Sequence, residues 1–268
     1  FLAGGIDSSV LAALASLPGG APVHTFTVTF DEARYSEAPF AAEVARLYRC
    51  NHQQVHLSAA RAALEIGGAL AALDQPSSDG VNTWFVSKAA RAAGLSVALS
   101  GLGGDELFAG YAFFRHFARS IAFFRRAGSL PAFLRARFGA LTSLSAAPTT
   151  LRKLAALLLS SGKPDEIYAV FRAMFTEDER AHLLAPDYVQ HAAHAGVSVP
   201  DHLLELVERR TIDPINALSA LELTNYIQNT LLRDSDVMSM AHALEVRVPL
   251  LDHVLVEKVL RVPGPLKL

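Results

Sequence analysis

The chain has 268 residues, enough for one large domain or two small ones. Its residues are 51% hydrophobic and 19% charged, which is typical of a globular protein with a sizeable core. The formal net charge of -2 gives no bulk attraction to nucleic acid or to an anionic membrane. A single cysteine, Cys50, excludes a disulfide framework and a cysteine-rich zinc site, fits a cytoplasmic location, and is expected to be a buried, neutral thiol.

The first part of the chain alternates strand patterns with helix patterns. Strands are predicted at residues 1–2, 23–30, 54–57 and 95–99. Helices are predicted between them at residues 8–16, 37–49, 58–73 and 82–93, the last closed by Gly94. Because strands that alternate with helices form a parallel sheet with right-handed crossovers, we expect an open α/β sheet.

From about Tyr111 the pattern changes to long helical stretches in which no strand is predicted. Breaks between them are indicated at residues 128–131, 146–150, 162–164 and 196–200. We therefore expect one domain with an α/β core at about residues 1–112 and a helical part at about residues 113–268. Both ends of the sequence are typical of a fragment of a longer protein, since the first predicted strand is only two residues long.

A glycine-rich segment, AGGIDSS at residues 3–9, lies between the first strand and the first helix. Gly4 and Gly5 permit close approach of a ligand, and free N–H groups at a helix start favour an anion. Ser8 and Ser9 add hydroxyl donors, and Asp7 can bind magnesium through an oxygen. The segment therefore predicts a phosphate-binding loop, with an ordinary capped turn as the alternative.

A second glycine-rich segment, SGLGGDE at residues 100–106, also follows a strand and precedes a helix. In an open parallel sheet, ligands bind beyond the carboxyl ends of the strands. If the first and fourth strands are neighbours, Asp7 and Asp105 face the same polyphosphate, and two carboxylates are a usual way to hold Mg2+ there. The alternative is two unrelated capped turns.

Four segments carry a family resemblance. AGGIDSS resembles the SGGxDSS pyrophosphate loop of the N-type ATP pyrophosphatases. LSGLGGDELFAGY, residues 99–111, is similar to the second motif of the asparagine synthetase family. Residues 74–91 and 231–253 resemble two further segments of that family, so the resemblance covers nearly the whole chain.

This resemblance implies a fold and a reaction. The fold is an open parallel sheet of the adenine nucleotide α-hydrolase-like type with a large helical C-terminal part. In the family, ATP with Mg2+ adenylates the side-chain carboxylate of aspartate. Ammonia, released from glutamine by an N-terminal glutaminase domain, then displaces AMP to give asparagine. The resemblance implies neither a nucleic-acid nor a membrane partner, and it leaves homodimer formation open.

The resemblance also implies roles for individual residues. Phe1 and Val28 border the adenine, Ser100 and Gly101 lie against the nucleoside, and Asp7 and Asp105 bind the metal. The pyrophosphate is held by Gly4, Gly5, Asp7, Ser8 and Ser9. Ala3 replaces the family's serine in this ATP-binding loop, and Leu102 replaces an acid close to the reacting acyl group. Gly103 and Glu106 complete the residues expected to shape the site.

The remaining candidates lie on the acceptor side. Arg233 is a candidate for contact with a negative ligand, with a surface salt bridge as the alternative. Glu245 and Arg247 are expected to form a buried pair that shapes the floor of the site, with direct contact to the substrate as the alternative. Asp79, Asn82 and Thr83 are candidates for binding the substrate's amino-acid end, with helix capping by Asp79 or a neighbour as the alternative.

Several other side chains are expected to be structural, and two other functions stay open. Met238, Met240 and Leu244 are expected to form the core face of a helix, and His242 and His253 are expected to be structural. Leu102 keeps open a tailoring enzyme that forms amide, macrolactam or β-lactam bonds on another carboxylate. A non-catalytic ATP-binding module is the alternative from a different class.

Overall fold

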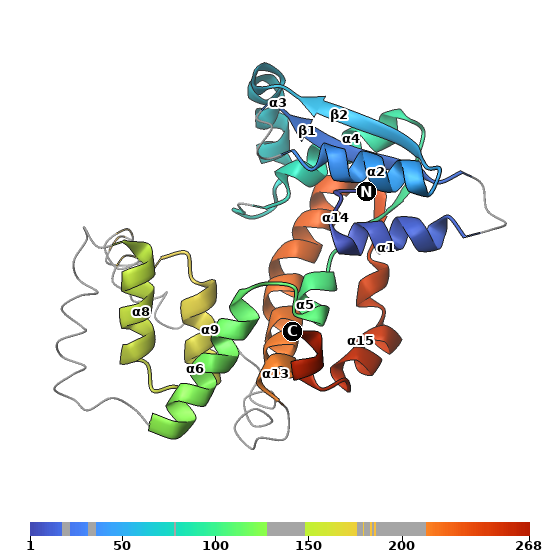
Figure 1. The fold of residues 1–268 in the computed structure, drawn as a ribbon. Coiled ribbons are helices and arrows are strands. Elements are labelled where there is room, and N and C mark those ends of the chain that lie inside the picture. The colour runs from blue at the N-terminus through green and yellow to red at the C-terminus, as the bar shows by residue number, and fades with distance from the viewer. Residues whose placement is uncertain are drawn as a thin grey trace. The chain divides into compact units, whose positions relative to one another are not determined.

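The computed structural model describes residues 1–17, 22–31, 36–77, 79–127, 148–175 and 213–268, with the single residues 179, 183 and 185. They form two compact units (Figure 1). The α/β unit contains Phe1–Asp105 and Tyr226–Lys258, and the helical unit contains Glu106–Asn225 and Val259–Leu268. The domain boundary near residue 112 stays a prediction.

The strands of the α/β unit are parallel, as predicted. Strand β1, His24–Phe30, pairs with β2, Asn51–Leu57, over its whole length. Strand β3, Val97–Leu99, pairs with β4, Glu245–Arg247. The first two residues connect the pairs, because the Phe1 nitrogen donates to the Leu99 carbonyl at 2.6 Å and the Leu2 N–H donates to the Phe26 carbonyl at 2.9 Å. The single open sheet of the α-hydrolase type stays a prediction.

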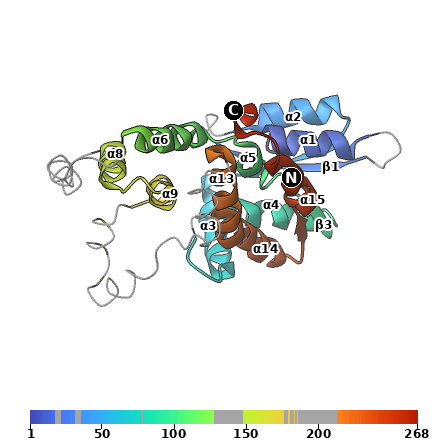
Figure 2. The same ribbon diagram turned by 90° about the horizontal axis from the view of Figure 1, so that it is seen from below.

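Helices cover both faces of β1. They are α1 (Ile6–Ala15), α2 (Ala38–Leu47), α3 (Ala59–Ala72), α4 (Val81–Ala92) and α14 (Leu232–Met240). Figure 2 shows α1 and α2 on one side of β1 and α4 on the other. Because successive strand side chains point to opposite faces, Phe26 packs on Val86 and Ala90 of α4, while Leu2, Ala12 and Ala41 form a separate cluster with α1 and α2.

The helical unit has an aromatic core. Its regular helices are α6 (Phe113–Ala127), α8 (Thr149–Leu159), α9 (Pro164–Arg172) and α13 (Pro214–Leu221). Phe114 and Phe117 of α6 are fully buried with Ile167 of α9 and Leu218 of α13. The predicted break at residues 162–164 lies between α8 and α9, and α8 begins within the break predicted at 146–150. The breaks predicted at 128–131 and 196–200 lie outside the described residues.

Shorter elements complete the described chain. Helix α5 is Gly104–Phe108, a π-helix spans Glu222–Leu231, and α15 is His253–Leu260. Two 3-10 helices lie at Pro249–Leu251 and Gly264–Lys267. None of the helices described here is long and apolar enough to cross a membrane.

Two predictions for the C-terminal part were wrong. Strand β4 lies where no strand was predicted, because three residues are too short for a readable period and β4 is defined by pairing with β3. Met238 is fully buried, but Met240 is 52% exposed at the end of α14, and the buried Leu244 lies beyond that helix.

Candidate functional site

The first glycine loop turns directly into α1. Gly4 has a φ of +84°, and a Cβ there would lie 2.7 Å from the Cβ of Phe40, so both conformation and packing require glycine. Gly5 is the N-cap of α1, with extended backbone at φ -71° and ψ 164° and no side-chain cap. The alternative of an Asp or Ser N-cap for this helix is therefore wrong.

The serine hydroxyls of this loop make hydrogen bonds within it. Ser8 Oγ accepts the Ala3 N–H at 3.2 Å and donates to the Gly5 carbonyl at 3.3 Å. Ser9 Oγ donates to the same carbonyl at 2.6 Å. These bonds shape the loop, and Ser9 remains half-buried while Ser8 is buried. A role of either hydroxyl in pyrophosphate binding stays a prediction.

The two glycine loops meet at Asp7. A Cβ built on Gly104 would lie 2.2 Å from Cγ of Asp7, and one built on Gly101 would lie 3.0 Å from its Cβ. Gly101 also approaches the backbone nitrogen of Ser8, at 3.0 Å from the same hypothetical Cβ. The second loop therefore lies directly against the start of α1, and the Asp7 carboxylate occupies the space that a side chain at position 104 would need.

The second loop is fixed from its other side by Leu251. Gly103 has a φ of +91°, and a Cβ there would lie 2.2 Å from Cδ2 of Leu251. The half-buried Leu102 follows Ser100, whose Oγ accepts the Leu102 N–H at 3.4 Å. A hydrocarbon side chain therefore stands where the family has an acid.

Asp105 and Glu106 differ in exposure. Asp105 is exposed, and partial burial of its carboxyl group raises its pKa above the ordinary value. Glu106, in the helical unit, is 1% exposed and accepts the hydroxyl proton of Tyr111 at 2.7 Å. Of these two adjacent carboxylates, Asp105 is therefore the accessible one.

A pocket of about 320 Å³ extends from the first loop along β1 to the start of α4. It contains three residues predicted for ATP, Phe1, Ala3 and Val28, and two predicted for the acceptor, Asn82 and Thr83. The sequence did not single out Glu37, which also lines it; its position at the N-cap of α2 gave no functional signal. The other lining residues are Leu2, Phe26, Thr27, Phe30 and Val86.

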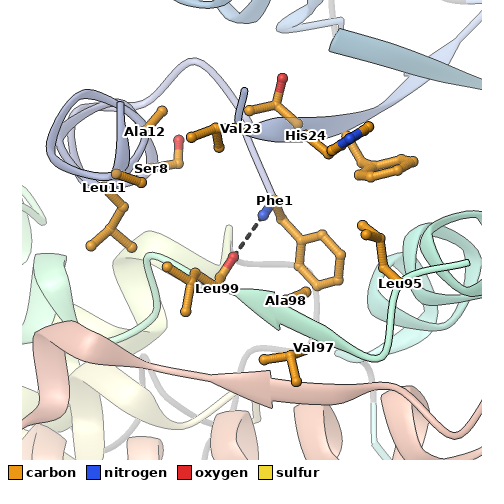
Figure 3. Close-up of a pocket in the computed structure, with 13 residues that line it drawn as sticks. Phe1, Ser8, Leu11, Ala12, Val23, His24, Leu95, Val97, Ala98 and Leu99 are labelled. Carbon is orange, nitrogen blue, oxygen red and sulfur yellow. Dashed lines mark hydrogen bonds between the residues drawn. The ribbon is translucent and has the colours of Figure 1, made fainter. Parts of the chain in front are cut away.

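A second pocket, of about 240 Å³, lies between α1, β1 and β3 (Figure 3). It reaches Val23 and His24 at the start of β1, and the ring of Phe1 lies beside Leu95 and Ala98. Two of its lining residues, Phe1 and Ser8, are predicted for ATP binding, and Leu99 lies at the carboxyl end of β3. The pocket therefore borders the predicted nucleotide site and extends to the start of β1.

The acceptor-side candidates are paired. Arg233 forms an ion pair with Asp74 at 3.0 Å, with both side chains partly exposed, so the salt-bridge alternative holds in this structure. Asp79 accepts the hydroxyl proton of Tyr226 at 3.3 Å. It does not cap α4, since the N-cap is Gly80, which has a φ of +87° and no side-chain cap bond. The capping alternative is therefore wrong for Asp79, and its neighbour Gly80 holds the N-cap position without a side-chain bond.

Glu245 and Arg247 form the predicted pair, with Nε to Oε1 at 2.7 Å, but their burial was wrongly predicted. Their side chains are 56% and 61% exposed because residues at alternate positions of β4 point to the same, uncovered face. Hydrogen bonding to Glu245 raises the pKa of Arg247 further.

Two side chains expected to be structural, Cys50 and His242, are half-buried, whereas His253 is exposed. Cys50 packs beside the Leu2 cluster, with its sulfur 3.6 Å from Ser16 Oγ. His242 stacks edge-on against Trp84 at 4.6 Å, and burial, followed by the charge of Lys88, lowers its pKa. Among the described residues, no three His, Cys, Asp or Glu side chains gather as a metal site. The predicted Mg2+ site has only Asp7 and Asp105 as protein ligands and stays a prediction.

These features define an α/β protein in which two glycine loops meet at a carboxylate beyond the ends of neighbouring parallel segments. The chain belongs to the asparagine synthase family, since the family model described as "Asparagine synthase" matches residues 1–268.

Curated relatives agree. Over its whole length the chain is 29% identical to a "Putative asparagine synthetase [glutamine-hydrolyzing]" of Mycobacterium tuberculosis and covers 39% of that protein. It is 28% identical to "Asparagine synthetase [glutamine-hydrolyzing] 1" of Bacillus subtilis and covers 40% of it. A shorter match, 34% identical over 114 residues, is to a putative asparagine synthetase of Methanocaldococcus jannaschii. The chain thus spans about two fifths of the length of the first two relatives.

Proposed function

We propose that this chain is the synthetase part of an enzyme that adenylates the side-chain carboxylate of aspartate and transfers ammonia to it. The observation that carries the proposal is the contact of the two glycine loops at Asp7, where a Cβ on Gly104 would lie 2.2 Å from Cγ. Two loops with the sequence of nucleotide-binding motifs converge there, beside the pocket lined by Phe1, Ala3 and Val28.

The residues present fit ATP and Mg2+. Gly5 has extended backbone with no heavy atom within 4 Å of the Cβ it lacks, so the loop is open on that side. Asp7 and Asp105 supply the carboxylate oxygens that Mg2+ prefers. The metal, when bound, neutralises charge on the pyrophosphate.

The reaction has two steps. A carboxylate oxygen of the acceptor attacks the α-phosphorus of ATP, and pyrophosphate leaves. The nitrogen of ammonia then attacks the acyl carbon, AMP leaves with the electron pair of the acyl C–O bond, and the nitrogen loses a proton. The N–H groups at the start of α1 stabilise the negative charge that develops on the departing pyrophosphate. Ammonia from glutamine, produced by a glutaminase domain of the full-length protein, is part of the proposal.

Leu102 favours a second candidate, a tailoring ligase that acts on another carboxylate. A leucine side chain neither accepts a proton nor donates a hydrogen bond, so it cannot replace the acid that the family has at this position. The second candidate shares the adenylation step and differs in the acceptor and the amine.

Pyrophosphate release by the full-length protein tests the proposal. We expect release that depends on ATP, Mg2+ and aspartate, with asparagine formed when ammonium is added. Release with another carboxylate alone favours the tailoring ligase, and ATP binding without release under any of these conditions favours a binding module.

A substitution at the proposed metal site sharpens this test. Asp105→Asn should abolish Mg2+-dependent release, while Glu257→Gln, an isosteric change of an exposed carboxylate on α15, should keep it. An unchanged rate in Asp105→Asn would contradict the role of Asp105.

A further inference from the structure

A polar contact within the α/β unit connects the loop before α4 to the π-helix and α14. We call it the loop clamp; it consists of Asp74, Gln75, Ser77 and Asp79 on the loop and Tyr226, Asn229, Arg233 and Asp234 on the helical segment. The two sides are about 150 residues apart in the sequence; three of the pairs are contacts between side chains, and Gln75 bonds to a backbone carbonyl.

Asp234 is the buried centre of the loop clamp. Its side chain belongs to a residue only 2% exposed, and its Oδ2 accepts the hydroxyl proton of Ser77. Ser77 Oγ in turn accepts the Asp79 N–H at 3.2 Å. Through these two hydrogen bonds, Ser77 connects the Asp234 side chain to the loop backbone at Asp79, two residues before α4 begins.

The outer bonds hold the loop at both ends. Asp74 pairs with Arg233, whose Nε lies 3.1 Å from Oδ2, and Gln75 donates to the Asn229 carbonyl at 3.3 Å. At the other end, Tyr226 donates its hydroxyl proton to Asp79 at 3.3 Å.

Packing at Gly80 fits α4 closely against the clamp. A Cβ on Gly80 would lie 3.2 Å from the Cβ of Asp234 and 3.1 Å from Cγ of Met238, and its φ of +87° also favours glycine. The next residues, Asn82 and Thr83, belong to the first turn of α4 and line the 320 Å³ pocket. The position of this turn relative to the pocket therefore depends on the clamp.

We propose that Asp234 and Tyr226 are positioning residues that fix the acceptor side of the pocket through the loop clamp. Neither lines the pocket, and both act through Ser77 and Asp79 on the first turn of α4. Since Asn82 and Thr83 of this turn line the pocket and are predicted for the acceptor rather than for ATP, loss of the clamp changes acceptor binding more than ATP binding. The kinetic part of this inference rests on the proposed function.

The kinetic test uses full-length Asp234→Ala and Tyr226→Phe, assayed for pyrophosphate release with aspartate and with ATP varied in turn. We expect the KM for aspartate to rise about three- to tenfold in each variant, the range for loss of one net hydrogen bond, with the KM for ATP changed less than about twofold. Asp234→Asn keeps an oxygen that can accept the Ser77 hydroxyl proton and should restore the aspartate KM. Tyr48→Phe, at an exposed tyrosine next to α2, is the matched control.

Hydrogen–deuterium exchange of the same proteins needs no activity. Amides of residues 74–92 should exchange faster in Asp234→Ala and Tyr226→Phe than in the wild type, while those of α1 do not change. If the wild type releases no pyrophosphate but this local exchange effect is present, the proposed function fails and the clamp stands. Unchanged exchange at residues 74–92, equal increases in both KM values, or no rescue by Asp234→Asn would overturn the clamp.

Discussion

Replacing Gly104 by alanine tests the contact between the two glycine loops directly. The added Cβ would lie 2.2 Å from Cγ of Asp7 and 2.3 Å from its Oδ2, whereas ordinary contacts begin at about 3.4 Å. The Asp7 carboxylate must therefore move by about 1 Å or more. Gly104 does not have a positive φ, so the conformation of its backbone adds no further obstacle.

The expected loss follows from this displacement. Misplacing a reacting or ligating group by about 1 Å can lower a rate by about 100-fold, which equals about 2.7 kcal/mol of transition-state stabilisation. The free energy of unfolding should fall less, near the low end of the roughly 1–3 kcal/mol typical of overpacking, because a carboxylate at the end of a side chain can rotate away. Catalysis should therefore suffer more than stability.

The assay compares Mg2+-dependent pyrophosphate release with urea unfolding for Gly104→Ala and Gly67→Ala. Gly67 lies in the interior of α3 with no heavy atom within 4 Å of its missing Cβ, so alanine there should stabilise by roughly 0.5–1 kcal/mol and leave activity unchanged. Adding Asp7→Ala to Gly104→Ala should restore the free energy of unfolding but not the activity. Full activity of Gly104→Ala with an unchanged Mg2+ requirement would refute the assignment of Asp7 as a metal ligand in this position.

Three further outcomes are expected. Gly103→Ala combines a φ of +91° with a Cβ 2.2 Å from Leu251 and should lower the free energy of unfolding by more than about 2 kcal/mol, with partial recovery in Leu251→Ala, both measured by urea unfolding. Arg172→Ala leaves the fully buried Glu222 without its bidentate partner and should cost about 3–5 kcal/mol in the same measurement. Because burial raises the pKa of Asp105, its carboxylate becomes protonated, and loses Mg2+, at a higher pH than an ordinary aspartate would. The Mg2+ concentration for half-maximal rate should therefore rise as the pH falls through that pKa. A pH-independent value would contradict this.

The sequence predicted those features that are encoded locally. The strand predicted at residues 23–30 is observed as β1, and the helix predicted at 82–93 is observed as α4, shifted by one residue. The meeting of the two glycine loops was also predicted, because strand ends in a parallel sheet lie at one edge, and hydrogen bonds of Phe1 and Leu2 place the first residues between β1 and β3.

Features that depend on distant partners could not be predicted in this way. The exposure of Glu245 and Arg247 depends on which face of β4 is covered, and three residues of sequence do not reveal it. The pairing of Ser77 with Asp234 joins residues 157 positions apart, and a serine in a turn usually bonds to its own backbone. The sequence predicted a turn-rich loop from residue 74, but it did not predict the contact of this loop with α14.

Packing within the fold explains three glycines of the two loops, but it does not explain Gly5. Gly103 and Gly104 are required by Leu251 and Asp7, and Gly4 is required by its positive φ and by Phe40. A protein that binds no nucleotide would need these three glycines for the same packing. Gly5 is different: its φ of -71° suits any residue, and no heavy atom lies within 4 Å of its missing Cβ.

The fold therefore gives no reason for glycine at position 5, and a ligand does. In the protein without nucleotide, Gly5→Ala should raise the free energy of unfolding by about 0.4–1 kcal/mol, because alanine restricts the unfolded chain. In the presence of MgATP, the same methyl group occupies the side from which a phosphate approaches the start of α1, so the affinity for ATP should fall. The measurement is the shift in melting temperature on adding MgATP, which should be large in the wild type and small in Gly5→Ala. A variant that is more stable and still shows the wild-type shift would mean that the phosphates do not bind at this loop.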